Sequence, residues 1–291
     1  MSLSFIAILS LAIPLQAIPP DSARATNPVA EYTHFLDALD NDNFDSIYAG
    51  IQYFKSHLVD LPLAERDTAF SEFMTFFFAT ISYHNDMIWE DYDLISRLHD
   101  RAARQNPETQ TYINSIQRNG LDLYTFGQLY YIDQQSDYLY SHFAPYVSLA
   151  MGEYLALRRD ELAVGFSDSD SLLITFREVG ERMIRWELYR ENYPNSVLAD
   201  AANYYYQLYL CSFLTGLKLS PVFESDGALR PELSTVYHEF ASRYLDTHSG
   251  MLVREFYIIL KEAGFSWTPK VRDFYVRRRI QNMHQAQIPY R

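Results

Sequence analysis

Hydrophobic residues recur three and four positions apart along most of the chain, and this spacing is the period of an amphipathic α-helix. Pro62 and Gly120 mark a helix start and a helix end, since proline is favoured in the first helical turn and glycine just after the last. In the first 120 residues the pattern predicts these helical segments: 29–58 with a break at 41–43, 60–81, 86–104 and 108–119.

The stretch from Leu121 to Asp133 follows neither the helical nor the strand period cleanly, and we expect a loop or a short β-hairpin there. Helical spacing returns from Asp137 to Leu162. Residues 167–171 are polar enough for a loop and a helix N-cap. We therefore place a soft domain boundary after an N-terminal helical region of residues 26–166.

The clearest repeated pattern is a helical hairpin. An apolar stripe in a helix predicted from Ser171 to Asn192 is cut by the turn Tyr193–Ser196, and a second amphipathic helix follows. The same arrangement returns 51 residues later around the turn Tyr244–Thr247. Each turn supplies a hydroxyl that can cap the next helix and an aromatic residue that can pack against it. We therefore expect both turns to join antiparallel helices.

The first turn reads Tyr-Pro-Asn-Ser at 193–196, and Ala-Asp-Ala-Ala-Asn-Tyr-Tyr follows at 199–205. This segment resembles the tetratricopeptide-like repeats of bacterial cell-envelope proteins, notably outer-membrane assembly factors, over about residues 171–263. The resemblance implies hairpins that stack into a curved solenoid, bind proteins or peptides and catalyse nothing.

Two features depart from that repeat pattern. Gln207 stands where a small residue is expected, and the insert Gly216–Arg230 lengthens the repeat beyond the usual ~34 residues. We therefore expect an all-α fold of antiparallel helix pairs in an irregular α/α array or solenoid. The tetratricopeptide-like hairpins would occupy residues 167–266 and a basic C-terminal helix residues 267–291.

Composition supports a folded helical chain. Hydrophobic residues make up 48% of the 291 residues, which excludes global disorder, and only ten are glycine, too few for the turns of an all-β fold. The net charge of −13 argues against nucleic acid as a partner. Residues 267–291 carry +5 of their own. We expect this segment to dock on the acidic body of the protein, and binding to an acidic partner or anionic lipid is the alternative.

The N-terminus has the features of a secretory signal peptide. Phe5–Ala17 is an apolar run too short to span a membrane, and Ala23-Arg24-Ala25 matches a cleavage site. We expect cleavage after Ala25 and an extracytoplasmic, periplasmic or secreted protein without an integral membrane segment. A buried N-terminal helix is the alternative, disfavoured by the prolines at 14, 19 and 20.

Candidate chemistry is sparse. Cys211 is the sole cysteine and lies in an apolar run, so we expect a buried, inert thiol and no disulfide. Histidines and carboxylates are densest between His84 and Asp100, but without a metal-binding motif we expect a solvated helix face. No hydrolase elbow, phosphate loop or dinucleotide motif occurs. We expect no catalytic residue, metal or cofactor.

Aromatic residues are the most unusual feature, with 24 Tyr and 19 Phe. Tyr204, Tyr205 and Tyr206 are consecutive, so in a helix they spread over about 200° and cannot all face one core. We expect Tyr205 to point inward and at least one neighbour to be partly exposed. Trp186 and Tyr189 would continue an aromatic strip, which makes Trp186, Tyr189, Tyr204 and Tyr206 the candidate binding residues.

These features favour an exported helical-repeat binding or scaffolding protein of the cell envelope, without catalytic activity, whose partner is a protein or peptide and possibly a glycan. One alternative is a carbohydrate-active hydrolase with two acidic residues in an α/α groove. Another is a glycan-binding protein with aromatic platforms. Two carboxylates of raised pKa in a concave pocket would favour the enzyme, and a shallow aromatic groove would favour a binder.

Overall fold

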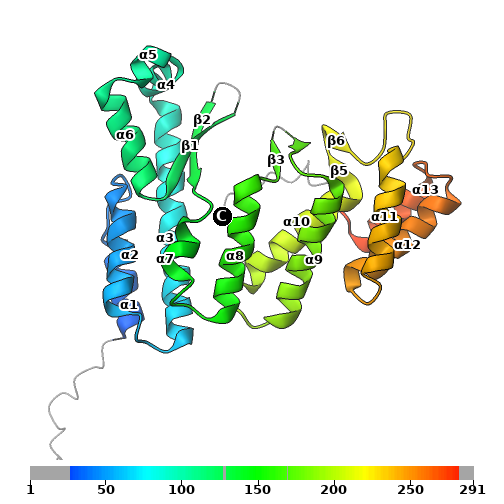
Figure 1. Cartoon of the computed structure of the whole chain (residues 1–291), viewed down its shortest axis with the longest axis horizontal. Helices are drawn as coiled ribbons and strands as arrows, with labels where there is room; N and C mark the ends of the chain where they lie inside the picture. Colours follow the sequence, from blue (N-terminus) through cyan, green and yellow to red (C-terminus); the bar gives the residue numbers. More distant parts are fainter. Residues whose placement is uncertain (1–26, 127–128, 169, 282–291) are drawn as a thin grey trace, which may run out of the picture.

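The structure is a computed structural model that describes residues 27–126, 129–168 and 170–281 (Figure 1). The expected signal peptide, residues 1–25, lies outside the described residues, as does the end of the basic C-terminal segment. Thirteen helices make up 67% of the described residues, and the strands among those residues form three two-stranded antiparallel sheets. The predicted all-α class is confirmed.

The elements before residue 166 are α1 (Pro28–Asp37), α2 (Asp45–His57), α3 (Leu63–Glu90), α4 (Tyr92–His99), α5 (Arg101–Arg104), α6 (Pro107–Arg118), β1 (Leu121–Phe126), β2 (Leu129–Gln134), α7 (Tyr138–Phe143) and α8 (Leu149–Val164). The elements after it are β3 (Ser167–Asp168), β4 (Ser171–Leu172), α9 (Phe176–Asn192), α10 (Ala199–Thr215), β5 (Gly216–Leu217), β6 (Ser220–Pro221), α11 (Pro231–Arg243), α12 (His248–Glu262) and α13 (Pro269–Arg278). Within the described ranges, no helix combines the length and apolar character needed to cross a membrane.

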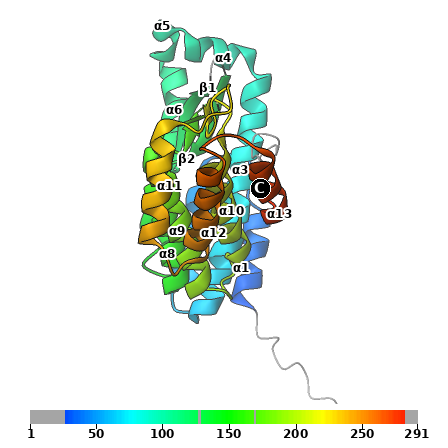
Figure 2. The ribbon, with the colours of Figure 1, turned by 90° about the vertical axis from the view of Figure 1, so that its right-hand side faces the viewer.

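The elements follow one another along the long axis of the molecule (Figure 1). Helices α1–α6 and the hairpin β1–β2 form one end, α7 and α8 come next, and the helix pairs α9–α10 and α11–α12 follow. Helix α13 lies at the other end. A view from that end shows α11 and α12 side by side in front of α9 and α10 (Figure 2). The chain therefore forms a row of packed helices.

Helix α3 is longer than the sequence pattern predicted. It begins directly after Pro62, as expected, but runs without a break to Glu90 instead of ending near residue 81. The polar residues at 82–85 do not interrupt it, because the side chains of His84 and Asn85 both find places inside the fold. Tertiary contacts thus override the local signal for a break.

The stretch that fits neither period forms the β-hairpin β1–β2, one of the two structures expected for it. The Asn85 side chain accepts a hydrogen bond from the Ile132 N–H (2.6 Å) and donates one to the Ile132 carbonyl (3.0 Å). The Trp89 indole N–H donates to the Tyr130 carbonyl (3.0 Å). Helix α3 therefore satisfies the outer edge of β2, as a third strand would.

The two predicted turns share the same backbone hydrogen bonds. The tyrosine after the first helix, Tyr193 or Tyr244, donates its N–H to the carbonyl four residues earlier (2.9 and 3.0 Å). The hydroxyl residue three positions later, Ser196 or Thr247, donates its N–H back to that tyrosine's carbonyl (3.1 and 3.2 Å). Each turn joins two helices that pack on each other, so the predicted equivalence is confirmed for the backbone of the turns.

Helix α9 begins later than expected. Ser171 and Leu172 form strand β4 and pair with β3, so the helix starts at Phe176 and not at Ser171. Thr175 and Glu178 form a capping box in which each side chain bonds the backbone N–H of the other. The soft boundary at 167–171 therefore contains a small hairpin followed by a capped helix.

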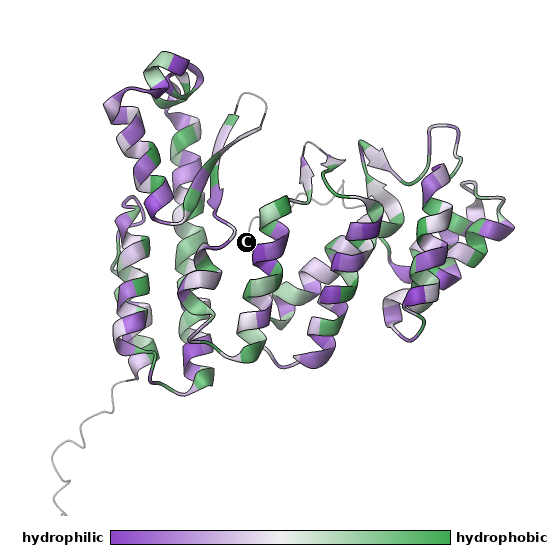
Figure 3. Cartoon of the chain, viewed as in Figure 1, coloured by the Kyte–Doolittle hydropathy of each residue, from purple (hydrophilic) through white to green (hydrophobic). Residues whose placement is uncertain are grey.

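Buried apolar side chains form one continuous cluster that runs from Tyr32 in α1 to Ile280 after α13. Hydrophobic and hydrophilic residues alternate around most helices, as the banded colouring of Figure 3 shows. Helices α9 and α10 occupy the middle of this cluster, where the N-terminal helices meet the second helix pair.

The basic helix α13 packs on α12. Arg277 and Arg278 both form ion pairs with Glu255 of α12, and Lys270 pairs with Glu262 (Nζ to Oε2, 3.1 Å). These pairs are exposed, so each contributes little to stability. They confirm that the described part of the basic C-terminal segment docks on an acidic part of the same chain.

His84 gives the fold a pH dependence. Its ring stacks on Phe44 with centroids 3.7 Å apart, and burial lowers its pKa to about 4. The unfolded chain takes up this proton near pH 6.5, whereas the folded chain does so only near pH 4, so this contribution to stability falls as the pH drops through that window. We expect the free energy of unfolding to fall by about 2 kcal/mol between pH 7 and pH 5 from this group alone.

Urea unfolding of the wild type and of His84→Phe at both pH values measures this contribution. The phenylalanine can keep the stack on Phe44 but carries no proton, so the variant should lose about 2 kcal/mol less over the same interval. Equal losses in both proteins would show that His84 does not cause the acid sensitivity.

Candidate functional site

The structure buries three of the four residues expected to form an exposed aromatic strip. Trp186 is 0% exposed and Tyr189 and Tyr206 are 2% exposed, whereas Tyr204 is 37% exposed. The strip is therefore wrong as a surface feature, although the expectation of at least one partly exposed ring is confirmed. The reason is that helices α8, α10, α11 and α12 all contact α9, so the face that carries Trp186 and Tyr189 meets other helices on several sides.

Both Tyr206 and Tyr205, the ring expected to point inward, pack on the core, and Tyr206 is buried more completely. The Tyr206 hydroxyl lies 3.1 Å from the Ser249 hydroxyl of α12, so this residue links the two helix pairs. Tyr205 is half-buried and stacks on Trp186 with centroids 4.9 Å apart. On the other flank, the Arg158 guanidinium lies 4.1 Å from the centre of the Tyr205 ring.

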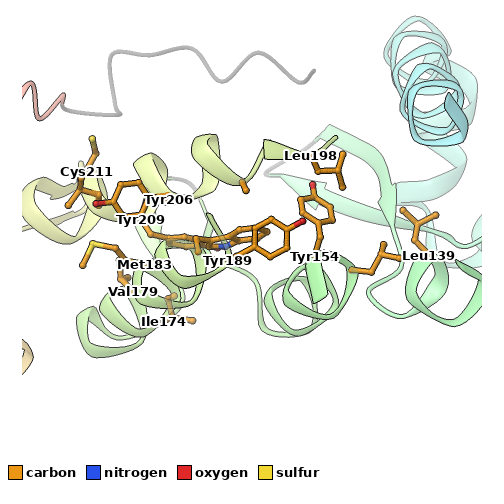
Figure 4. Close-up of a cluster of buried hydrophobic side chains, with 14 of the residues drawn as sticks. Leu139, Tyr154, Ile174, Val179, Met183, Tyr189, Leu198, Tyr206, Tyr209 and Cys211 are labelled. Atoms are coloured by element: carbon orange, nitrogen blue, oxygen red, sulfur yellow. The ribbon is translucent and has the colours of Figure 1, made fainter. Parts of the chain in front are cut away.

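Three of the predicted residues join one buried aromatic layer with Tyr154 of α8. Figure 4 shows this layer running from Leu139 past Tyr154 and Tyr189 toward Cys211. The Tyr154 ring contacts both Trp186 (5.5 Å between centroids) and Tyr189 (6.2 Å). Trp186, Tyr189 and Tyr206 thus lie in one cluster, as expected, but this cluster is part of the core. At its edge, Tyr204 is exposed and Tyr205 is half-buried.

A buried charge lies within this layer. The Glu161 carboxylate is 5% exposed, and it accepts hydrogen bonds from the Trp186 indole N–H (2.6 Å) and from the Arg158 guanidinium (2.8 Å). Burial raises the pKa of Glu161, while the positive charges of Arg158 and Arg182 act against that rise. Both carboxylate oxygens are therefore engaged inside the protein.

A second carboxylate with a raised pKa comes from the β-hairpin. Burial raises the pKa of Asp133, and the charge of Arg158 opposes this rise. Asp133 also acts electrostatically on Tyr205 of α10 and on Tyr124 of β1. Arg158 thus lies between a carboxylate of the hairpin and one of its own helix.

The exposed edge of this region is the candidate functional site, and we call it the junction surface. It combines the stacked pair Tyr124–Tyr131 on the hairpin (5.6 Å between centroids) with the pair Tyr204–Tyr205 on α10 (5.4 Å). Burial raises the pKa of one ring of each pair, Tyr124 and Tyr205, and the charge of Asp133 acts on both rings and contributes to both rises. Two parts of the chain that are distant in sequence thus each carry an aromatic pair that includes a ring influenced by the charge of Asp133.

Comparison with known proteins adds no family to this description. No family model, curated protein or solved structure matches the chain.

The arrangement is poorly suited to acid–base catalysis. A glycosidase needs two carboxyl groups that both reach the substrate. Glu161 is shielded from solvent and both of its oxygens are bonded to protein groups, so a substrate would have to displace Arg158 and Trp186 to reach it. What the surface offers instead is aromatic area with one acidic and one basic group, which is the usual composition of a binding site.

The remaining candidates for chemistry are structural. Among the residues that the structure describes, no three His, Cys, Asp or Glu side chains are placed to hold a metal ion. His84 lies in the core against Phe44 instead of on a solvated face. Cys211 is buried as predicted, and burial raises the pKa of its thiol.

Sequence analysis did not single out Asp133, Arg158 or Glu161. Arg158 and Glu161 stand in a run of four charged residues, which has the pattern of an exposed helix face. One signal was available: an indole N–H on a buried stripe, such as that of Trp186, needs an acceptor. The sequence gives no means of locating that acceptor, because it lies on a different helix.

Proposed function

We propose that this chain is an exported helical-repeat binding or scaffolding protein of the cell envelope that recognises a protein or peptide and catalyses no reaction. The observation that carries the proposal is the junction surface, which comprises Tyr204 and Tyr205 of α10, Tyr124 and Tyr131 of the hairpin, and Asp133, whose charge acts on Tyr205 and Tyr124. Tyr204 and Tyr124 are exposed while Tyr205 and Tyr131 are half-buried, and tyrosines that keep part of the ring accessible beside charged groups are typical of a protein interface.

The helix-pair architecture supports the same proposal. Two pairs with equivalent turns are fastened together by the Tyr206–Ser249 hydroxyl contact and by Glu187, which accepts hydrogen bonds from the first N–H groups of α12. Such linked pairs make a rigid surface, and rigidity reduces the entropy lost when a partner binds. The export part of the proposal rests on the apolar run Phe5–Ala17 and the Ala23–Ala25 motif.

The test is a binding comparison between matched variants. The chain from Thr26 onward, immobilised as the wild type, is used to capture partners from envelope extract, and each captured protein is then purified and titrated. We expect Tyr204→Ala to weaken binding of the true partner by about tenfold or more, since interface tyrosines often contribute over 1 kcal/mol.

Gln207→Ala serves as the control, because Gln207 is an exposed residue one turn further along α10. It should bind within about twofold of the wild type, and both variants should unfold at the wild-type urea concentration. If a purified partner bound Tyr204→Ala as tightly as the wild type, the junction surface would not be its binding site. Binding of soluble envelope glycans that is lost in Tyr204→Ala, with no protein partner captured, would favour the glycan-binding alternative.

A further inference from the structure

A concave site lies at the N-terminal end of the molecule, between α1 and α3. It has a volume of about 210 Å³ and opens beside the turn that links α1 to α2. Its lining residues are Thr33, Leu36, Asp37, Leu39, Asn41, Glu72, Thr75, Phe76 and Ala79. We call it the α1–α3 cleft.

The volume limits what the cleft can hold. Sites for drug-sized ligands usually exceed about 300 Å³, and a cavity of roughly 150 Å³ accommodates benzene. The α1–α3 cleft lies between these values, so it fits one long side chain or a ligand of that size. Leu36 and Phe76 are buried at its base and provide apolar contact for such a group.

The polar groups of the cleft are mostly acceptors. Asp37 and Glu72 contribute carboxylates, and no lysine or arginine lines the cleft. The Thr33 and Thr75 hydroxyls donate to backbone carbonyls of their own helices (3.1 and 3.2 Å), which leaves these oxygens able only to accept. Asn41 adds one amide, whose oxygen accepts a hydrogen bond from the Thr80 hydroxyl (3.2 Å). Two carboxylates and two threonine oxygens thus favour a ligand that brings hydrogen-bond donors and positive charge.

Within residues 27–126, 129–168 and 170–281, no basic side chain forms an ion pair with either carboxylate, since the ion pairs there involve acidic groups other than Asp37 and Glu72. The net charge of −13 adds a general attraction for basic partners. Charge complementarity thus points to a cation carried on an apolar stem.

We infer that the α1–α3 cleft binds an arginine side chain presented by a partner polypeptide, an inference that rests on the proposed binding function. The methylene stem packs on Leu36 and Phe76 while the guanidinium reaches Asp37 and Glu72. Arginine is favoured over lysine because its five donors match a site with several separate acceptors, whereas an ammonium has only three.

The experiment uses backbone amide chemical shifts of the full mature chain, titrated with a blocked pentapeptide that has one central arginine between alanines. Shifts should move at Thr33, Asn41 and Thr75 and saturate in the millimolar range. The double variant Asp37→Asn, Glu72→Gln should bind the peptide at least about tenfold more weakly. The control double variant Glu31→Gln, Glu65→Gln alters the same two helices by the same charge outside the cleft and should bind as the wild type does.

Three results would overturn the inference. Equal weakening in both double variants would show general charge attraction and no site. Equal binding of the matched citrulline peptide, which keeps the shape but not the charge, would show apolar contact only. Binding of free arginine as tight as that of the peptide would assign the cleft to a small metabolite, because the free carboxylate should be repelled by Asp37 and Glu72.

This outcome is separable from that of the junction surface. If the arginine peptide does not bind the cleft but a protein partner binds in a Tyr204-dependent way, the arginine inference is wrong and the proposed function is retained. If the arginine peptide binds the cleft specifically but no partner depends on Tyr204, the arginine inference is retained and the junction surface is not the binding site.

Discussion

Replacing Glu161 with alanine should destabilise the protein by about 3–5 kcal/mol, the range found when one partner of a buried ion pair is removed. The carboxylate holds Arg158 and the Trp186 indole N–H in the middle of the core. Without it, the buried indole N–H loses its acceptor, and the largely buried guanidinium of Arg158 loses its hydrogen-bonded carboxylate and keeps the weaker influence of Asp133. Urea unfolding followed by circular dichroism measures the loss.

Two further variants separate charge from volume. Glu161→Gln keeps the size of the side chain, so most of the loss should remain if the unpaired charge of Arg158 is its cause. Asp160→Ala removes the neighbouring carboxylate, whose partner Arg159 is solvent-accessible, and should change the free energy of unfolding by less than about 1 kcal/mol. Similar effects of Glu161→Ala and Asp160→Ala would contradict the buried network.

Replacing Glu187 with alanine should also destabilise the protein strongly, by about 3 kcal/mol. Its carboxylate, buried in α9, accepts hydrogen bonds from the His248 N–H (2.6 Å) and the Ser249 N–H (3.0 Å) at the start of α12. Hydrogen bonds to a charged group are worth about 1.5–3 kcal/mol each, and the positive end of the helix dipole adds to them. The variant leaves these donors unsatisfied where the two helix pairs meet.

The matched control is Glu191→Ala, one helical turn further along α9 and exposed to solvent. It should alter the free energy of unfolding by less than about 0.5 kcal/mol. Hydrogen exchange adds a local measurement: Glu187→Ala should speed exchange in the first turn of α12 more than in α3. Uniform exchange throughout the chain would mean that Glu187 does not fasten this helix end.

Local signals predicted the helices well where sequence neighbours decide them. The Pro62 start, the Gly120 end and the turns at 193–196 and 244–247 depend on residues within one helical turn of each other. The expected helix break at residues 82–85 was wrong, because Asn85 bonds to strand β2 within a continuous α3. The expected helix start at Ser171 was wrong as well, because Ser171 and Leu172 pair with strand β3.

In the candidate site, too, features set by neighbouring residues were predicted and features set by distant helices were not. The tyrosine triplet was correctly expected to leave one ring partly exposed, because three consecutive helical residues cover too wide an arc for one core. That Tyr206 is buried more completely than Tyr205 depends on Ser249 and Trp186, residues of other helices, and was not predicted from the sequence. The charged residues Arg158 and Glu161 were not identified because their pattern in sequence is that of a solvent-exposed face.

The sequence by itself determined the helical class, the two equivalent turns and the burial of Cys211, since these follow from periodicity, capping chemistry and local apolar runs. Only the tertiary structure decided that Trp186 and Tyr189 are core, that Glu161 is a buried charge and that the charge of Asp133 in the hairpin acts on Tyr205 of α10. The physical reason is that burial depends on which distant segments cover a face. A helix's own sequence specifies which face is apolar, but not how many neighbours pack around it.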